Sequence, residues 1–149
     1  MVLNAGNWYA KILPDFGMNM ISLACGDRHI LRSPQNMDTL KKEPYVYGIP
    51  LLFPANRVEK GMFTFDGKSY HFPINEPARN NHIHGLMFDA PFRLIEQTRS
   101  RVEAIYENKG ERYPFPFSMT VTDTLTPGGL TRKLYLKNAY RVLLTRARQ

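Results

Sequence analysis

Residues 115–122 read FPFSMTVT, and this stretch decides the fold class. Its large apolar residues alternate with small or polar ones, with the period of two that a β-strand shows when one face is buried. A second stretch, residues 62–72, reads MFTFDGKSYHF and holds two strand-like segments around the dipeptide Asp66-Gly67. That dipeptide suits the positive φ angles of a two-residue hairpin turn. The sequence therefore predicts an antiparallel hairpin and a strand with one buried face.

Frequent chain breakers separate the remaining segments. Eleven Pro and ten Gly punctuate the 149 residues, and an irregular stretch, residues 73–91, follows the predicted hairpin. No window shows the sustained apolar period of an amphipathic helix. We therefore predict an all-β fold, an antiparallel β-sandwich or barrel. Further strands are expected at Trp8–Leu13, Met18–Ala24, Arg28–Leu31, Arg101–Tyr106 and Lys133–Lys137.

The composition is that of a globular protein, with 43% hydrophobic, 22% charged and 12% aromatic residues. No apolar run reaches the roughly 20 residues that a membrane-spanning helix needs. The first 13 residues lack the continuous apolar block of a signal peptide. Cys25 is the single cysteine, so no internal disulfide is expected. We therefore expect a cytoplasmic protein without a membrane partner, in which Cys25 is a small buried residue.

The net charge of +7 is concentrated at the end of the chain. The last 19 residues carry six basic residues and no acid, whereas the rest has fourteen basic against thirteen acidic residues. A nucleic-acid-binding protein usually spreads its basic residues over one face of the fold, so no nucleic-acid partner is expected. We expect one β domain over residues 1–138. Residues 139–149 are expected to be an irregular basic tail, at a frayed or frame-shifted end rather than an arm for an anionic partner.

Residues 80–85, NNHIHG, form the densest polar cluster of the sequence. On an extended segment His82 and His84 would point to one side, where two imidazoles suit metal binding, proton transfer or contacts to hydroxyl groups. Loop histidines bonded to nearby carbonyls are the alternative. A metal site needs three or four ligands. Asp89 is the nearby carboxylate, and the Glu that follows the His pair of a cupin-like barrel is missing, so the metal site lacks ligands.

A second cluster lies in residues 48–58, GIPLLFPANRV. Arg57 brings a rigid fork of donors, and Asn56 brings both donors and acceptors. Such groups suit a ligand with vicinal hydroxyl groups. The alternative is that Arg57 caps a strand end or pairs with a surface acid such as Glu59.

Taken together, residues 50–86, PLLFPANRVEKGMFTFDGKSYHFPINEPARNNHIHGL, resemble the N-terminal half of the aldose 1-epimerases, the galactose mutarotase-like proteins. Met18-Asn19 with the strand that follows, and residues 120–131, TVTDTLTPGGLT, also correspond to strands of that family. The resemblance implies a truncated part of a β-supersandwich. It also implies the interconversion of α and β anomers of a hexose, such as galactose or glucose, by acid–base ring opening without metal or organic cofactor.

The same resemblance implies roles for individual residues. Arg57 corresponds to the family's substrate-binding arginine, and His84 to its first active-site histidine, the catalytic residue expected here. Asn56, Asn81 and His82 are their neighbours and are expected to bind the monosaccharide.

The sequence departs from the family after these residues. The family's second histidine, its Asp and its general-base Glu come later, whereas this sequence has no His after His84 and no acid after Asp123. We therefore expect the N-terminal portion of such a protein, with impaired catalysis. The alternatives are a non-catalytic carbohydrate-binding remnant and a metal-binding cupin-like barrel that uses His82 and His84. Half a sandwich would leave strand edges uncovered, so self-association is also expected.

Overall fold

The computed structural model describes residues 1–137, and the predicted tail at residues 139–149 lies outside the described residues. The described part consists mainly of antiparallel strands, with a short helix α1 (Met37–Lys42) and a 3-10 turn η1 (Pro77–Arg79). The predicted all-β fold is confirmed. The strands are β1 (Val2–Ala5), β2 (Trp8–Leu13), β3 (Asn19–Cys25), β4 (Arg28–His29), β5 (Val58–Glu59), β6 (Met62–Phe65), β7 (Lys68–His71), β8 (Asn81–His82), β9 (Arg93–Gln97), β10 (Arg101–Asn108), β11 (Phe117–Thr126) and β12 (Gly129–Lys137).

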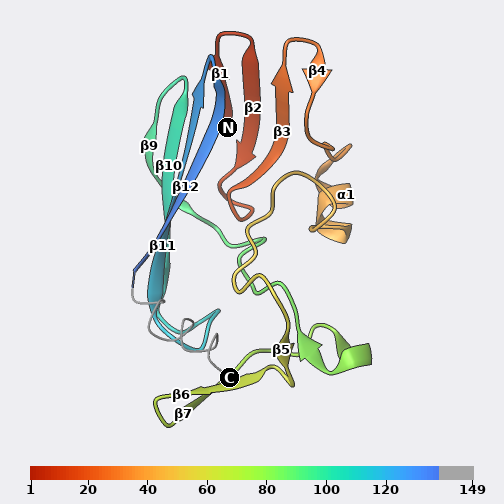
Figure 1. The fold of residues 1–149 in the computed structure, drawn as a ribbon, viewed down its shortest axis with the longest axis vertical. Coiled ribbons are helices and arrows are strands. Elements are labelled where there is room, and N and C mark those ends of the chain that lie inside the picture. The colour runs from red at the N-terminus through yellow and green to blue at the C-terminus, as the bar shows by residue number, and fades with distance from the viewer. Residues whose placement is uncertain (138–149) are drawn as a thin grey trace. The chain divides into compact units, whose positions relative to one another are not determined.

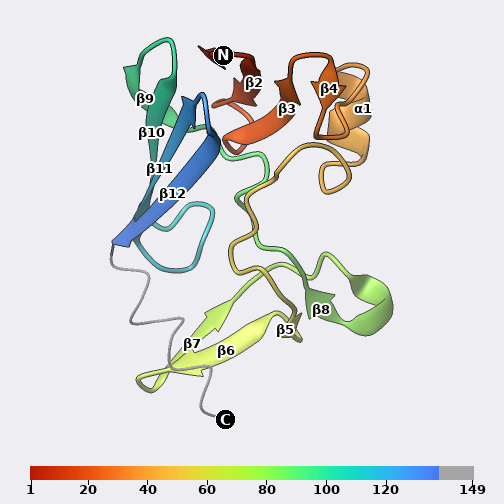
Figure 2. The ribbon, with the colours of Figure 1, turned by 45° about the horizontal axis from the view of Figure 1, so that its top comes forward.

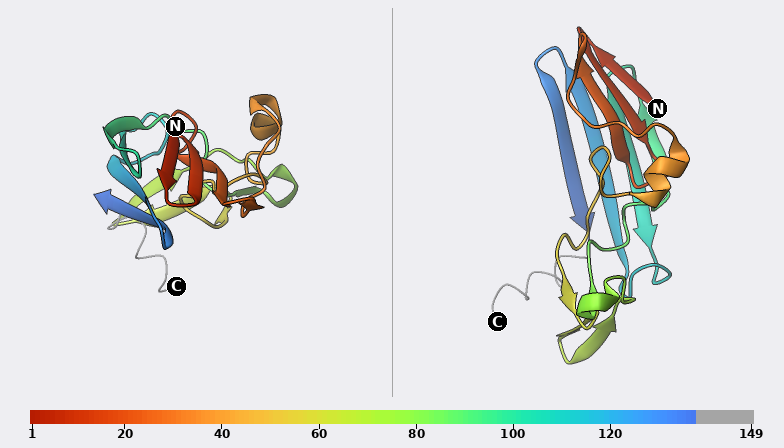
Figure 3. Two further views of the ribbon diagram at one scale, coloured as in Figure 1. Left: turned by 90° about the horizontal axis from the view of Figure 1, so that it is seen from above. Right: turned by 90° about the vertical axis from the view of Figure 1, so that its right-hand side faces the viewer.

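The first of two compact units comprises Met1–Leu51, Met87–Tyr106 and Thr120–Tyr135. It contains a four-stranded sheet of order β1-β2-β3-β4, red to orange in Figure 1, and most of a second sheet of order β12-β11-β10-β9, blue to green. Backbone hydrogen bonds link segments in or beside the two sheets. Asn4 N donates to Arg99 O over 2.8 Å, and Phe92 N donates to Pro14 O over 3.0 Å. The right-hand view of Figure 3 shows the long strands of both sheets running in a similar direction.

The core of the first unit is apolar and is supplied by both sheets. Alternate residues of β2 and β10 are buried, as the period of two requires for strands with one face in a core. The residues without any exposed surface include Leu3, Ala10, Ile12, Met20, Val102, Ala104 and Val121.

One ion pair is buried in this unit. Asp123 of β11 has no exposed surface, and both its oxygens accept hydrogen bonds from Arg132 of β12, over 2.6 and 2.7 Å. The same guanidinium donates to the carbonyl oxygens of Ile49, over 3.2 Å, and Met18, over 2.8 Å. Arg132 therefore joins the β11–β12 hairpin to the chain before β3 and to the segment at Ile49.

The second compact unit comprises Leu52–Leu86, Glu107–Met119 and the described residues from Leu136. It contains the β6–β7 hairpin and the short β5–β8 pair, shown in yellow and green in Figure 2. The hairpin is the one predicted, with Asp66 and Gly67 at φ angles of 49° and 70°. Buried aromatic side chains form the interior of this unit, among them Phe53, Phe72, Tyr113, Phe115 and Phe117.

The structure also corrects details of the strand prediction. β11 begins at Phe117 instead of Phe115, and Pro116 explains the difference because proline cannot donate to a sheet ladder. β1, β9 and the β5–β8 pair were not predicted. All five residues of β9 are exposed, so this strand lacks the buried alternation that marks a strand in sequence. Cys25 is only partly buried at the end of β3, so the prediction of a buried thiol is wrong.

Candidate functional site

The five predicted site residues all lie in the second unit, on or beside the β5–β8 pair. Val58 of β5 pairs with His82 of β8, and Glu59 pairs with Asn81. Asn56 and Arg57 directly precede β5, and His84 follows β8 after one residue. The antiparallel register thus brings the Asn56-Arg57 step toward the segment that carries His84.

Arg57 forms a two-pronged ion pair with Glu76. Its Nε donates to one carboxylate oxygen over 2.7 Å, and its Nη2 donates to the other over 2.8 Å. The alternative named from the sequence, that Arg57 pairs with an acid, is confirmed, but the acid is Glu76 and not the suggested Glu59, which lies 3.9 Å from Lys60. The reason is geometric: Glu76 meets the guanidinium fork with both oxygens in parallel, the arrangement that arginine favours with carboxylates. The Arg57 side chain stays 42% exposed, so it can reach a ligand.

Glu76 gathers several polar groups around one carboxylate. Besides Arg57, it accepts a 3.2 Å hydrogen bond from the Nδ2 of Asn81 and lies 3.8 Å from Arg79. Hydrogen bonding by Arg57 is the largest cause that lowers the pKa of Glu76 to about 2. The carboxylate is therefore ionised throughout the neutral range, and Arg57 and Asn81 are held by the same anion.

Asn56 contributes to the local turn rather than to this network. Its Oδ1 accepts a 2.7 Å hydrogen bond from the backbone N–H of Arg57. This hydrogen bond fixes the backbone of Arg57, whose side chain binds Glu76. The amide nitrogen of Asn56 can donate to a further group at this exposed position.

His82 is placed differently from His84. It has no exposed surface, its Nδ1 lies 2.7 Å from the carbonyl oxygen of Pro73, and its ring stacks on Phe72 with centroids 4.7 Å apart. Because a carbonyl only accepts, Nδ1 carries the proton, and the buried Nε2 finds no hydrogen-bond partner among the described residues. Burial is the largest cause that lowers the pKa of His82. His82 is therefore a neutral interior side chain.

His84 leaves the extended path, so the predicted side-by-side arrangement with His82 does not hold. β8 ends at His82, and His84 has a φ of 65°, in the left-handed region. A side chain other than glycine is uncommon there, and such a backbone costs about 1–3 kcal/mol and persists only where its surroundings hold it. Close packing at the next residue, Gly85, restricts the backbone beside His84. A Cβ built on Gly85 would overlap the carbonyl oxygen of Phe53, so only glycine lets these backbones meet.

Four further residues of this site escaped the sequence analysis. Asn75 and Glu76 lie in the irregular stretch, and Arg112 and Tyr113 follow β10. The Asn75 side chain forms hydrogen bonds with the backbone of Ile83. Arg112 and Tyr113 form hydrogen bonds with the backbone of Leu86. The polar density of residues 73–91 was the available signal for the first two. Nothing local to residues 112–113 marks them, because their partners are far away in the chain.

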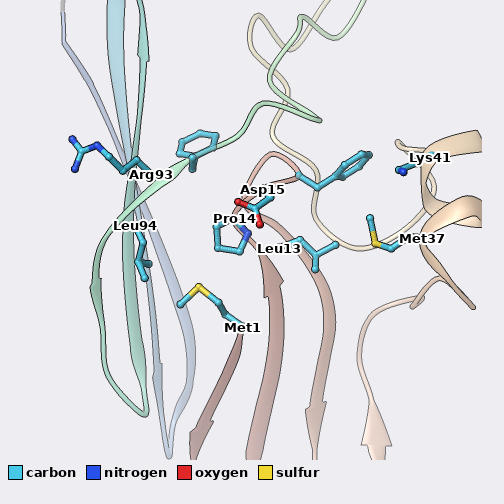
Figure 4. Close-up of a pocket in the computed structure, with 10 residues that line it drawn as sticks. Met1, Leu13, Pro14, Asp15, Met37, Lys41, Arg93 and Leu94 are labelled. Carbon is cyan, nitrogen blue, oxygen red and sulfur yellow. The ribbon is translucent and has the colours of Figure 1, made fainter.

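The first unit holds a pocket of about 700 Å³. Its walls are mainly apolar, and Figure 4 shows Met1, Leu13, Pro14 and Leu94 facing it while the Arg93 guanidinium points away. None of the five predicted site residues lines it.

Residues 1–137 contain neither a cluster of metal ligands nor a membrane-spanning helix. Within residues 1–137, no three His, Cys, Asp or Glu side chains lie close enough together to hold a metal ion. In the same part of the chain, every helix is too short or too polar to span a lipid bilayer.

Known proteins with similar sequences support the resemblance to the galactose mutarotase-like proteins. Rat galactose mutarotase is 38% identical over 93 residues, which cover 61% of this chain and 27% of the rat protein. Human galactose mutarotase is 36% identical over 95 residues, with the same two shares. The matched part of this chain thus spans about a quarter of the length of these relatives.

Solved structures extend the similarity to the fold. A galactose mutarotase-like protein from Clostridium acetobutylicum superimposes with a TM-score of 0.81 and 30% identity, covering 91% of this chain and 44% of that chain. A galactose mutarotase-like protein from Lactobacillus casei, at 18% identity and a TM-score of 0.70, shares the fold. Residues 2–144 match the family described as aldose 1-epimerase. The chain therefore belongs to the aldose 1-epimerase family.

Proposed function

We propose that this chain binds an aldohexose, of the galactose or glucose type, through Arg57 and His84. The observation that carries the proposal is the Arg57–Glu76 pair. An arginine has five N–H donors, and Glu76 takes one from Nε and one from Nη2. Three donors remain in a fixed plane, and the guanidinium is partly exposed. A fixed set of donors suits neighbouring hydroxyl groups on a pyranose ring.

His84 is the proposed catalytic residue. Interconversion of the anomers needs a base that takes the proton from the C1 hydroxyl and an acid that protonates the ring oxygen, so that the ring opens, turns about C1–C2 and closes. Imidazole suits either transfer near neutral pH. Since the family's first active-site histidine contacts the ring region of the sugar, we assign His84 to proton transfer at the ring oxygen.

Asn81 and Asn56 are proposed as additional hydroxyl contacts. Asn81 is held by Glu76 through its Nδ2, which leaves its Oδ1 as an acceptor that a sugar hydroxyl can use. We assign His82 a supporting role, because its fully buried ring packs on Phe72. No metal or organic cofactor enters this proposal.

Catalysis by this chain is proposed to be impaired. One positioned acid or base contributes about 10²–10⁴ in rate. The partner groups that the family resemblance implies, a second histidine and a general-base Glu, are not in this sequence, which has no His after His84 and no acid after Asp123. Little turnover is therefore expected of the chain as given, and carbohydrate binding without turnover is the alternative. Family membership argues against the cupin-like alternative.

Polarimetry tests the proposal. Freshly dissolved α-D-galactose or α-D-glucose is mixed with the protein, and equilibration is followed against buffer alone and against His84→Ala. We expect a small acceleration at most, lost in His84→Ala, and a sugar-dependent change in NMR spectra that both Arg57→Ala and His84→Ala weaken. Unchanged spectra at high sugar concentration would contradict sugar binding.

Self-association is a separate proposal. β12 and β9 form the two edges of their sheet and expose large apolar side chains, with Leu134 and Tyr135 at 48% and 60% and Leu94 and Ile95 at 42% and 49% exposure. Exposed edge strands pair readily with other chains. Sedimentation at increasing concentration should show oligomers that Tyr135→Lys reduces; a monomer throughout would contradict this. A cytoplasmic location stays a prediction.

A further inference from the structure

The backbone before His84 is held by one side chain. The amide of Asn75 bonds both polar groups of Ile83: its Nδ2 donates to the carbonyl oxygen over 2.9 Å, and its Oδ1 accepts from the N–H over 2.6 Å. A neighbouring strand would make the same pair of bonds to an extended residue. Asn75 therefore replaces a strand at the position where β8 has ended.

The backbone after His84 is held from a different segment. Leu86 N donates to the hydroxyl oxygen of Tyr113 over 2.7 Å, and Arg112 Nη1 donates to the carbonyl oxygen of Leu86 over 2.8 Å. The Tyr113 hydroxyl in turn donates to the carbonyl oxygen of Phe53 over 2.5 Å. Tyr113 has no exposed surface, so this hydrogen bond lies in the interior of the second unit.

In the sequence, His84 thus lies between Ile83 and Leu86, whose backbone N–H and C=O groups are all bound by side chains. Strained backbone persists where the surrounding structure holds it from several sides, and such positions are concentrated at functional sites. The left-handed φ of His84 meets this description. A loop that only connected β8 to the next segment would not need four side-chain hydrogen bonds around one non-glycine residue.

We propose that Asn75 is a positioning residue that sets the direction of the His84 imidazole, with Tyr113 holding the other side. The proposal deepens the assignment of His84 and rests on the proposed sugar site for its functional consequence. Asn75 itself need not touch the sugar. It acts by fixing the Ile83 backbone, so its removal lets the chain at His84 relax toward more common φ angles and turns the imidazole away.

The test uses the full chain with labelled histidines. The variants are Asn75→Ala, which removes both bonds, and Asn75→Asp, which keeps the size and the acceptor but places an oxygen against the Ile83 carbonyl. Asn80→Gly is the matched control: it removes an exposed amide from the same loop and tolerates the left-handed φ of 53° at that position. Tyr113→Phe removes the hydroxyl that accepts the hydrogen bond from Leu86 N on the other side of His84.

Two readouts separate positioning from a general loss of structure. The first is the ring C–H NMR signal of His84, with His29 and His71 as internal references, and the second is the affinity for D-galactose. We expect Asn75→Ala to move or broaden the His84 signal while the two references stay in place. The dissociation constant should rise about tenfold or more, since small displacements of a site group have effects of this order. Asn75→Asp and Tyr113→Phe should show smaller changes, and Asn80→Gly none.

The outcomes are distinct. An unchanged His84 signal in folded Asn75→Ala would overturn the proposal, and so would loss of folding in both Asn75 variants, because Asn75 would then support the whole unit. If the His84 signal moves as expected but the wild-type chain shows no response to galactose, the positioning role stands and the proposed function fails.

Discussion

The two compact units of this chain use their charged residues in opposite ways. In the first unit Asp123 is fully buried, and Arg132 bonds it together with two backbone carbonyls. In the second unit Arg57 also holds a carboxylate, Glu76, with two parallel bonds, but its side chain remains 42% exposed. An arginine–carboxylate pair is therefore structural in one unit and accessible to a ligand in the other.

The backbones of the units differ in the same sense. Sheets of four strands satisfy the main chain of the first unit, whereas β5 and β8 of the second unit have two residues each. Side chains such as Asn75 and Tyr113 supply the missing backbone partners there. A short irregular segment can take the shape a site needs, and the hydrogen bonds of side chains then hold that shape.

The largest effect is expected from breaking the buried pair of the first unit. Asp123→Ala leaves the Arg132 guanidinium buried without its carboxylate, and loss of one partner of a buried ion pair costs about 3–5 kcal/mol. The free energy of unfolding from urea titrations measures it. Asp27→Ala, at an exposed position, should change it by less than about 0.5 kcal/mol. An Asp123→Ala loss as small as that of the control would contradict the contrast.

Gly85→Ala should cause the next largest loss in the free energy of unfolding. The new Cβ would overlap the Phe53 carbonyl oxygen, and φ is 69°, so we expect a loss of about 2–3 kcal/mol. Gly67→Ala is the matched control in the same unit, since its φ is 70° but nothing lies within 4 Å of the added Cβ. That variant should lose only the backbone part, about 1–2 kcal/mol. Equal losses would show that the close approach at Gly85 has no role.

The buried His82 should make the stability of the second unit depend on pH. Burial lowers its pKa in the folded state below the ordinary value of 6.5, so the unfolded chain binds the extra proton more readily. The contribution of neutral His82 to the free energy of unfolding is therefore fully present above pH 6.5. It falls as the pH drops toward the folded-state pKa, by at most about 1.4 kcal/mol per pH unit. Denaturation curves between pH 5 and 8 measure this slope. His82→Phe should flatten it, and exposed His71→Phe should not.

Glu76→Gln is expected to have the smallest effect on folding and a measurable one on binding. The glutamine keeps one acceptor for Arg57 but loses the charge, so galactose affinity should fall severalfold with little change in melting temperature. The wild-type pair contributes fully above about pH 4.5 and is lost as the pH falls toward 2. Unchanged affinity in this variant would mean that Glu76 does not aim Arg57.

Much of the fold could be predicted from sequence because it rests on local patterns. The alternation of residues 115–122 and the Asp66-Gly67 turn each carry their own signal, and both are present in the structure. β9 was missed because all its residues are exposed, and a strand without a buried face has no period to detect.

The site was only partly predictable for a related reason. Arg57 and His84 stand in recognisable segments, but their supports depend on contacts across the chain. Glu76 meets Arg57 from 19 residues away, and Tyr113 meets Leu86 from 27 residues away. The expected pairing of His82 with His84 assumed an extended segment, and the left-handed turn at His84 breaks it.

An NMR titration with D-galactose tests the central claim most directly, namely that Arg57 and His84 contact one sugar. With isotope-labelled arginine and histidine side chains, the account predicts that the Arg57 Nε–H and His84 ring signals shift together along one binding curve. The buried Arg132 signal should stay fixed. Shifts confined to Arg132 or to the exposed His29, or separate curves for Arg57 and His84, would contradict the claim.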